Sequence, residues 1–151
     1  MPQFELDLGN ANKQFNELDS FTQGYIEAMF FTSTGADNED EGLGNGTNFE
    51  EFAPETLAAI ILDCATFQSQ FDVLLNWAYS YGEEHPDCEY PTTDICECET
   101  MAGRDYWYNR NGCGVGFWDR NLGDCGDLLY KACRYSEKYL YRGDDGLLYL
   151  D

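Results

Sequence analysis

The chain has 151 residues, of which 43% are hydrophobic and 16% aromatic, and it carries 29 acidic against 8 basic side chains. This length predicts one domain with a substantial core, and this apolar content excludes a disordered acidic tail. The net charge of -21 at pH 7 argues against direct binding to nucleic acid or to an anionic membrane, so we expect cationic partners.

The sequence carries no pattern typical of an export signal or a membrane span. Its start, MPQFELDLGN, has no basic segment followed by an apolar one, and nowhere do about 18 apolar residues run together. We therefore expect a cytoplasmic protein. Seven cysteines would suit a disulfide framework in an exported chain, but the odd number favours reduced thiols or a metal site.

The apolar spacing of the first half predicts, in chain order, a strand over 4–8, a helix over 21–33 and a long amphipathic helix over 54–81. Asp19 and Ser20 offer an N-cap to the first helix, and Pro54 suits the first turn of the second. Two acidic segments, near 34–49 and 82–99, lack apolar periodicity, so we expect flexible loops there.

The second half predicts a helix before Asn111, a glycine-rich entry into a short strand over 113–119, a helix capped by Asp124, and a hairpin that pairs 139–141 with 147–149. The predicted architecture is a single α+β domain. Its helices, one of them long and amphipathic, should pack on a small antiparallel β-sheet.

Charge is distributed unevenly along the chain. Residues 1–101 hold 21 acids and one base, Lys13, whereas residues 102–151 hold 8 acids and 7 bases. Acids of the first part therefore have no local cation to pair with, and their mutual repulsion destabilises the compact state. This pattern is typical of a surface that presents negative charge to a partner, although plain solubility would produce the same totals.

Four segments resemble a family of small uncharacterised proteins that phages and their plasmid-like relatives encode. They read AGRDYWYNRNGCGVGFWDRNLGD over 102–124, YLYRGDDGLLYL over 139–150, FTQGYIEAMFFT over 21–32 and APETLAAIILDCATFQ over 53–68. The resemblance implies a phage origin and no particular activity. Family members commonly have a histidine where this chain has Cys113, which argues against an obligate catalytic imidazole there.

One loop contains residue types that bind zinc. His85, Cys88, Cys96 and Cys98 form an H-x2-C-x7-C-x-C pattern that could hold a structural zinc ion, with reduced surface thiols as the alternative. No other cofactor is predicted. Asp37, Glu39, Glu41 and Gly42 echo the first half of a calcium loop, but Asn48 stands where a bidentate glutamate is needed.

Three further chemistries have simpler structural alternatives. Cys113 lies in a glycine-rich turn but lacks a nearby base in sequence, so a nucleophilic role is disfavoured. Acidic residues could suit a hydrolytic metal and aromatic residues could suit base stacking, but ion pairs, a helix cap and the core explain them better. These residues are Asp105, Asp119 and Asp124, and Tyr106, Trp107, Tyr108, Phe117 and Trp118.

The favoured hypothesis is an inhibitor that mimics DNA and binds a basic host protein, such as a nuclease, a restriction or defence enzyme, or a polymerase. Its phosphate-mimicking carboxylates would be Glu50, Glu51, Glu55, Asp63 and Asp72 on structured elements, and Asp37, Glu39, Asp40, Glu41, Glu83, Glu84, Asp87 and Glu89 in the loops. Tyr79 or Tyr81 could add aromatic contacts at the centre of the interface.

Two alternatives stay open. The first is a small phage enzyme or ligand-binding module with a pocket in segment 104–119. The second is an accessory phage protein whose acidity serves only solubility and whose partner is another phage subunit. A homodimer is compatible with each of the three.

Overall fold

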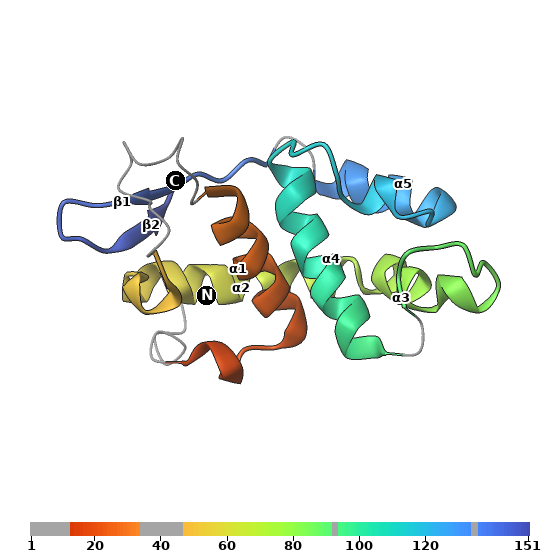
Figure 1. Ribbon diagram of the computed structural model, residues 1–151, viewed down its shortest axis with the longest axis horizontal. Coiled ribbons are helices and arrows are strands. Elements are labelled where there is room, and N and C mark those ends of the chain that lie inside the picture. The colour runs from red at the N-terminus through yellow and green to blue at the C-terminus, as the bar shows by residue number, and fades with distance from the viewer. Residues whose placement is uncertain (1–12, 34–46, 92–93, 134–135) are drawn as a thin grey trace.

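The computed structural model describes residues 13–33, 47–91, 94–133 and 136–151. In chain order its elements are η2 (Phe15–Glu17), α1 (Ser20–Ser33), η4 (Phe49–Glu51), α2 (Pro54–Gln70), α3 (Asp72–Ser80), η5 (Tyr81–Glu83), α4 (Ile95–Arg110), η6 (Phe117–Asp119), α5 (Gly123–Cys133), β1 (Leu140–Arg142) and β2 (Leu148–Leu150). The predicted α+β architecture is confirmed: helices pack with a small antiparallel sheet (Figure 1). The strand predicted over 4–8 lies outside the described residues.

The two central helices, α1 and α4, lie side by side (Figure 1), and their backbones are in direct contact at one crossing point. A Cβ on Gly24 of α1 would lie 2.0 Å from the carbonyl oxygen of Thr100 on α4. In the opposite direction, a Cβ on Gly103 of α4 would lie 1.9 Å from the carbonyl oxygen of Phe21 on α1. Each helix therefore needs a glycine at the crossing, because any side chain would separate the two backbones.

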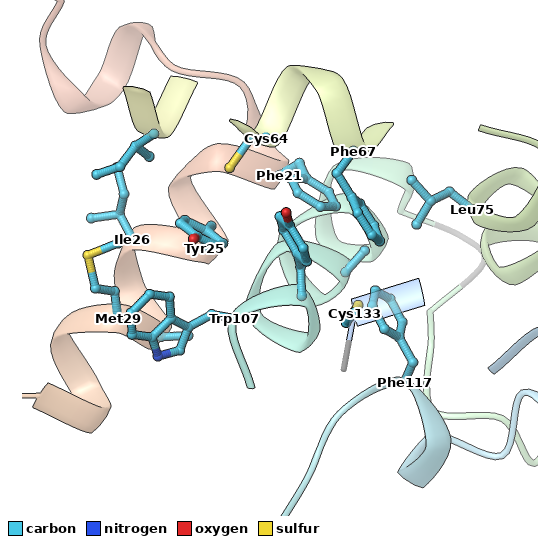
Figure 2. Packing of buried hydrophobic residues seen from close by; sticks show 14 of the residues in the cluster. Phe21, Tyr25, Ile26, Met29, Cys64, Phe67, Leu75, Trp107, Phe117 and Cys133 are labelled. Atoms are coloured by element: carbon cyan, nitrogen blue, oxygen red, sulfur yellow. The ribbon is translucent and has the colours of Figure 1, made fainter. Parts of the chain in front are cut away.

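Aromatic side chains fill the space around this crossing (Figure 2). Phe67 of α2 stacks on Tyr106 of α4 with ring centroids 4.0 Å apart, and Tyr25 of α1 meets Trp107 edge to face at 5.4 Å. These four residues and Phe117 are buried. Tyr106, Trp107 and Phe117 therefore belong to the core and are not available for stacking on nucleic-acid bases.

The long helix predicted over 54–81 is wrong as a single element. It is divided into α2 and α3 at Phe71, whose φ of -116° and ψ of 29° are not helical, and the two parts are bent by 77°. Phe71 packs on Phe67 at 4.9 Å, and the bend lets α3 reach α4 and α5. Neither a glycine nor a proline marks the bend, and the apolar spacing continues through it. The sequence pattern therefore does not reveal the bend.

The irregular segment predicted over 82–99 ends earlier than expected. The side chain of Asp94 accepts a hydrogen bond from the backbone N–H of Glu97 at 3.2 Å and caps α4, which begins at Ile95. The loop predicted near 34–49 likewise ends earlier, because Asn48 caps η4. Residues 34–46 of that loop lie outside the described residues.

The strand predicted over 113–119 does not form. The side-chain amide of Asn109 donates to the Val115 carbonyl at 3.1 Å and accepts from the Phe117 N–H at 2.8 Å, so one side chain takes the place of a neighbouring strand. Gly116 has a φ of 144°, and a Cβ there would lie 2.0 Å from the Asn109 amide nitrogen. The glycines of this segment permit a tight loop instead of an extended strand.

The predicted C-terminal hairpin is confirmed. β1 and β2 pair antiparallel, with Leu140 opposite Leu150. The carbonyl oxygen of Leu148 also accepts a hydrogen bond from the Ala53 N–H at 3.1 Å, immediately before α2. The hairpin therefore closes the end of the molecule at which α2 begins, opposite the end occupied by α3 (Figure 1).

Among the described helices, none alone has the length and apolar composition to cross a membrane. Only α2 and the segment from Asp72 to Glu83, taken together around their 77° bend, meet both criteria.

Candidate functional site

All four arginines of the described segments form ion pairs with carboxylates of the same chain. The pairs are Arg104–Glu27 (2.9 Å), Arg110–Asp63, Arg120–Asp105 (2.8 Å) and Arg142–Glu51 (2.8 Å). Arg142 also holds the pKa of Glu51 below its usual value, through a hydrogen bond to the carboxylate. Four of the seven Lys and Arg side chains in the described residues are thus paired within the chain, and the buried Arg110 and the largely buried Arg120 and Arg142 are three of these four.

Asp63, one of the predicted phosphate mimics, is part of a polar cluster at the centre of the fold. Its carboxylate accepts hydrogen bonds from the Arg110 guanidinium, from the Tyr106 hydroxyl at 2.7 Å and from the Tyr25 hydroxyl at 3.4 Å. The Arg110 side chain is only 6% exposed. Asp63 therefore neutralises a buried cation and joins α1, α2 and α4, a structural role that accounts for this carboxylate without a partner.

Asp105, one of the aspartates weighed as a hydrolytic metal ligand and disfavoured, is fully buried in a second such cluster. Arg120 approaches both carboxylate oxygens, and the Tyr90 hydroxyl donates to one of them at 2.7 Å. Burial raises the pKa of Asp105, and the hydrogen bonds from Arg120 and Tyr90 oppose that rise. Asp119 and Asp124 are exposed, so the three aspartates do not share a metal site.

Ten of the 19 exposed carboxylates in the described residues lie at one end of the molecule, where α3, η5, loop 84–91, the first turn of α4, η6 and the first turn of α5 come together (Figure 1). The loop is tied to this end by hydrogen bonds from Glu89 N–H to the Arg120 carbonyl and from the Asn121 side chain to the Asp87 carbonyl. We call this end of the molecule the acidic end. Its exposed carboxylates are those of Asp72, Glu83, Glu84, Asp87, Glu89, Asp94, Glu97, Asp119, Asp124 and Asp127. Arg120, their nearby cation, is already paired with Asp105 and Glu89.

The predicted set of phosphate mimics is therefore divided. Five of its members, Asp72, Glu83, Glu84, Asp87 and Glu89, lie at the acidic end. Glu50 and Glu55 are exposed beside the hairpin, at the opposite end of α2, whose 17 residues span about 25 Å. Asp37, Glu39, Asp40 and Glu41, with the calcium-loop echo, lie outside the described residues.

Sequence reasoning did not assign Asp94, Glu97, Asp119, Asp124 or Asp127 to this surface. Asp94 and Glu97 stand at the start of α4, and Asp124 and Asp127 in the first half of α5. The helix dipole favours acids near helix N-termini, so Asp94 and Glu97 could have indicated the start of α4. Their convergence with α3 depends on the bend at Phe71, which the sequence did not indicate.

The four predicted zinc ligands are not brought together. Within the described chain, which includes all four, no three His, Cys, Asp or Glu side chains lie close enough to share a metal ion. The Cys98 thiol is buried against the Pro91 carbonyl at 3.0 Å, whereas Cys96 is exposed. The ring of His85 stacks on Tyr81 with centroids 4.0 Å apart, away from the thiols, so the predicted zinc site is not formed.

A pocket of about 690 Å³ borders the glycine-rich turn that follows α4. Its lining includes Cys113, Trp118 and Lys131. Burial raises the pKa of the Cys113 thiol, which disfavours the nucleophilic thiolate, and the histidine of the chain lies in another hollow. The arrangement can hold a ligand, but no histidine that could activate Cys113 is among the described residues that line it.

The aromatic residues suggested for a partner interface are placed differently from expectation. The Tyr79 hydroxyl is buried, with no hydrogen-bond partner among the described residues, and burial raises its pKa. Tyr81 is half-buried. The exposed aromatic side chain of α3 is Trp77, which the sequence analysis did not single out and which is 43% exposed.

Comparison with known proteins identifies no relative. No family model, no curated protein and no solved structure matches this chain.

Proposed function

We propose that this protein is an acidic inhibitor of the kind that a phage encodes, acting in the host cytoplasm. It would bind a basic protein that processes nucleic acid or defends the cell, such as a nuclease, a restriction enzyme or a polymerase. Carboxylates of the acidic end would occupy the partner's DNA-binding channel in place of backbone phosphates and so exclude DNA.

The observation that carries this proposal is the separation of the two signs of charge. Each described arginine is paired within the fold, while ten exposed carboxylates share one end of the molecule with a single, already paired cation. Attraction to a basic channel is strongest when the charge is not neutralised locally. A protein that needed acidity only for solubility could distribute these carboxylates evenly.

A structural explanation covers only part of the acidic end. Asp72, Asp94, Glu97 and Asp124 stand in the first turns of helices or at a cap, where the helix dipole favours acids. Glu83, Glu84 and Asp87 lie in η5 and the loop after it. A 3-10 segment of three residues supplies little dipole, so these three carboxylates are the best candidates for a binding role.

The test compares two triple variants that remove equal charge from opposite ends. Glu83→Gln, Glu84→Gln and Asp87→Asn neutralise the acidic end, and Glu50→Gln, Glu55→Gln and Asp144→Asn are the matched control. Each protein is immobilised, exposed to host lysate at low salt, and eluted with a duplex DNA oligonucleotide. We expect wild type and control to release a nucleic-acid-processing protein on addition of DNA, and the acidic-end variant to retain none.

Two results would contradict the proposal. One is capture of the same proteins by both triple variants, which would place the interface elsewhere. The other is capture that duplex DNA does not reverse, because a DNA mimic and DNA must compete for one site.

The pocket beside the glycine-rich turn supports a second candidate function, a ligand-binding module. Its volume of about 690 Å³ is in the range of small-molecule sites, and Trp118, 46% exposed, offers an aromatic wall. Native mass spectrometry of protein purified from host cells should then show a bound mass that the Trp118→Ala variant lacks. An unliganded wild-type spectrum would count against this candidate.

A further inference from the structure

A smaller hollow lies on the acidic end, where α3 passes into η5, with a volume of about 300 Å³. We call it the α3 hollow. Its walls are Trp77, Ser80, Tyr81, Glu83, Glu84 and His85. It is separate from the pocket at the glycine-rich turn and shares no lining residue with it.

Three of the six residues that line the α3 hollow carry aromatic rings. The ring centroids of Trp77 and Tyr81 are 6.5 Å apart, and the ring of His85 stacks on Tyr81 with centroids 4.0 Å apart. Tyr81 is held from behind by Gly123, where a Cβ would lie 2.3 Å from its hydroxyl oxygen. The start of α5 therefore packs against the Tyr81 hydroxyl.

Two carboxylates also line the α3 hollow. Glu83 and Glu84 are exposed and make no ion pair in the part of the chain that the structure describes, and neither lysine nor arginine lines the hollow. An aromatic face attracts a cation through its ring quadrupole, and nearby carboxylates add charge and hydrogen-bond acceptors. This combination selects an organic cation, because a hard metal ion requires several oxygen ligands and gains little from indole.

We infer that the α3 hollow binds an arginine side chain of a protein partner. A planar guanidinium can lie on the indole of Trp77 while its N–H groups donate to Glu83 and Glu84, whereas an ammonium makes point contacts only. The inference deepens the proposed function and rests on it, since a DNA-binding channel is rich in arginine. The α3 hollow would supply the specific central contact that dispersed carboxylates lack.

The test uses the full chain and capped tripeptides with arginine, lysine or citrulline as the central residue. Citrulline has nearly the shape of arginine and no charge. The indole N–H signals of the tryptophans are followed by NMR and assigned with Trp77→Phe and Trp118→Phe variants. We expect the arginine peptide to shift the Trp77 signal saturably, the lysine peptide to bind about fivefold more weakly, and citrulline to have no effect.

Matched variants separate the hollow from general acidity. Glu83→Gln with Glu84→Gln should weaken binding of the arginine peptide by about tenfold or more, whereas Glu50→Gln with Glu55→Gln removes the same charge and should leave it unchanged. Trp77→Ala should abolish the saturable binding and Trp118→Ala should not, although the two side chains are similarly exposed, 43% and 46%.

The inference is overturned if the Trp77 signal does not shift, if citrulline shifts it equally, or if both double variants bind alike. Its failure can be distinguished from failure of the proposed function. DNA-reversible capture of a host protein without arginine binding would leave only the inhibitor proposal standing. Arginine binding without such capture would support the hollow and contradict DNA mimicry.

Discussion

At the scale of single residues, a carboxylate has a different role according to whether an arginine reaches it. Asp63 is held by Arg110 and two tyrosine hydroxyls, whereas Asp72, nine positions later, is exposed. Both stand on a helix, and neither has a lysine or an arginine nearby in the sequence. Their roles could not be separated without knowing which face of α2 meets Arg110.

The two aspartates therefore predict opposite effects of the same substitution. Asp63→Asn leaves the guanidinium of Arg110 buried without a counter-charge, and we expect the free energy of unfolding to fall by about 2–3 kcal/mol. Asp72→Asn should change it by less than about 0.5 kcal/mol. Urea unfolding followed by circular dichroism measures both, and an equal loss in the two variants would refute the structural role of Asp63.

Glu99 should make stability depend on pH in a recognisable direction. Burial, with a smaller contribution from Asp19, raises the pKa of Glu99 above 4.5 in the folded protein. The folded state therefore keeps the Glu99 proton to a higher pH than the unfolded chain does. The contribution of Glu99 to the free energy of unfolding is complete below the pKa of the unfolded state, and it is lost as the pH rises through the pKa of the folded state.

The measurement is the free energy of unfolding between about pH 4 and 7. We expect Glu99→Gln to decline less with rising pH than wild type does. Glu97→Gln, exposed on the same helix, is the control and should follow the wild-type slope. A Glu99→Gln slope equal to that of wild type would show that this carboxyl is not responsible.

At the scale of elements, the crossing of α1 and α4 depends on two glycines. Gly24→Ala or Gly103→Ala should each lower the free energy of unfolding by about 2–4 kcal/mol, because the new methyl group meets a carbonyl oxygen of the other helix. Alanine in an exposed helix has the opposite effect, since it stabilises by about 0.5–1 kcal/mol.

Thermal unfolding of the single and double variants tests this contact. Once one methyl group has separated the helices, the second should cost less, so the double variant should lose less stability than the sum of the two. Strictly additive losses would indicate two independent defects and not one shared crossing.

The sequence predicted the positions of most helices and the hairpin, because apolar spacing and caps are local signals. Pro54 and Asp124 stand in the first turns of α2 and α5 as predicted, whereas the cap of α4 by Asp94 lies in a segment predicted to be irregular. The bend at Phe71 and the loop held by Asn109 could not be predicted in this way. Both depend on contacts between elements, Phe71 through the packing of α3 and Asn109 through hydrogen bonds across the glycine-rich turn.

At the scale of the whole molecule, the unpaired carboxylates repel one another. The net charge of -21 should make the protein more stable as NaCl screens this repulsion, with a rise in Tm of several degrees, about 5 °C, between about 0.01 and 0.5 M. The Glu83→Gln, Glu84→Gln, Asp87→Asn variant should be more stable at low salt and respond less. A Tm independent of salt would mean that the carboxylates are too dispersed to interact.

For the candidate site, composition predicted the sign of the surface but not its geometry. Five of the predicted mimics lie at the acidic end, Glu50 and Glu55 lie at the other end, and Glu51 and Asp63 are engaged by arginine. The division arises because α2 separates the two groups along its length (Figure 1). The hollow beside Trp77 was missed although its lining is local: all its walls come from residues 77–85, and Trp77, Tyr81 and His85 recur at four-residue steps along the sequence.

The inward pairing of the arginines has a consequence for how this sequence can evolve. Loss of Arg110 or Arg120 would leave the carboxylate of Asp63 or Asp105 without its counter-charge in or near the core, so these arginine positions tolerate little change. Exposed acids such as Glu83 and Asp87 can be exchanged, gained or lost with small effects on the fold. Mutation and selection can therefore change the acidic end to fit a changing partner, while the arginine–carboxylate pairs within the fold stay constant.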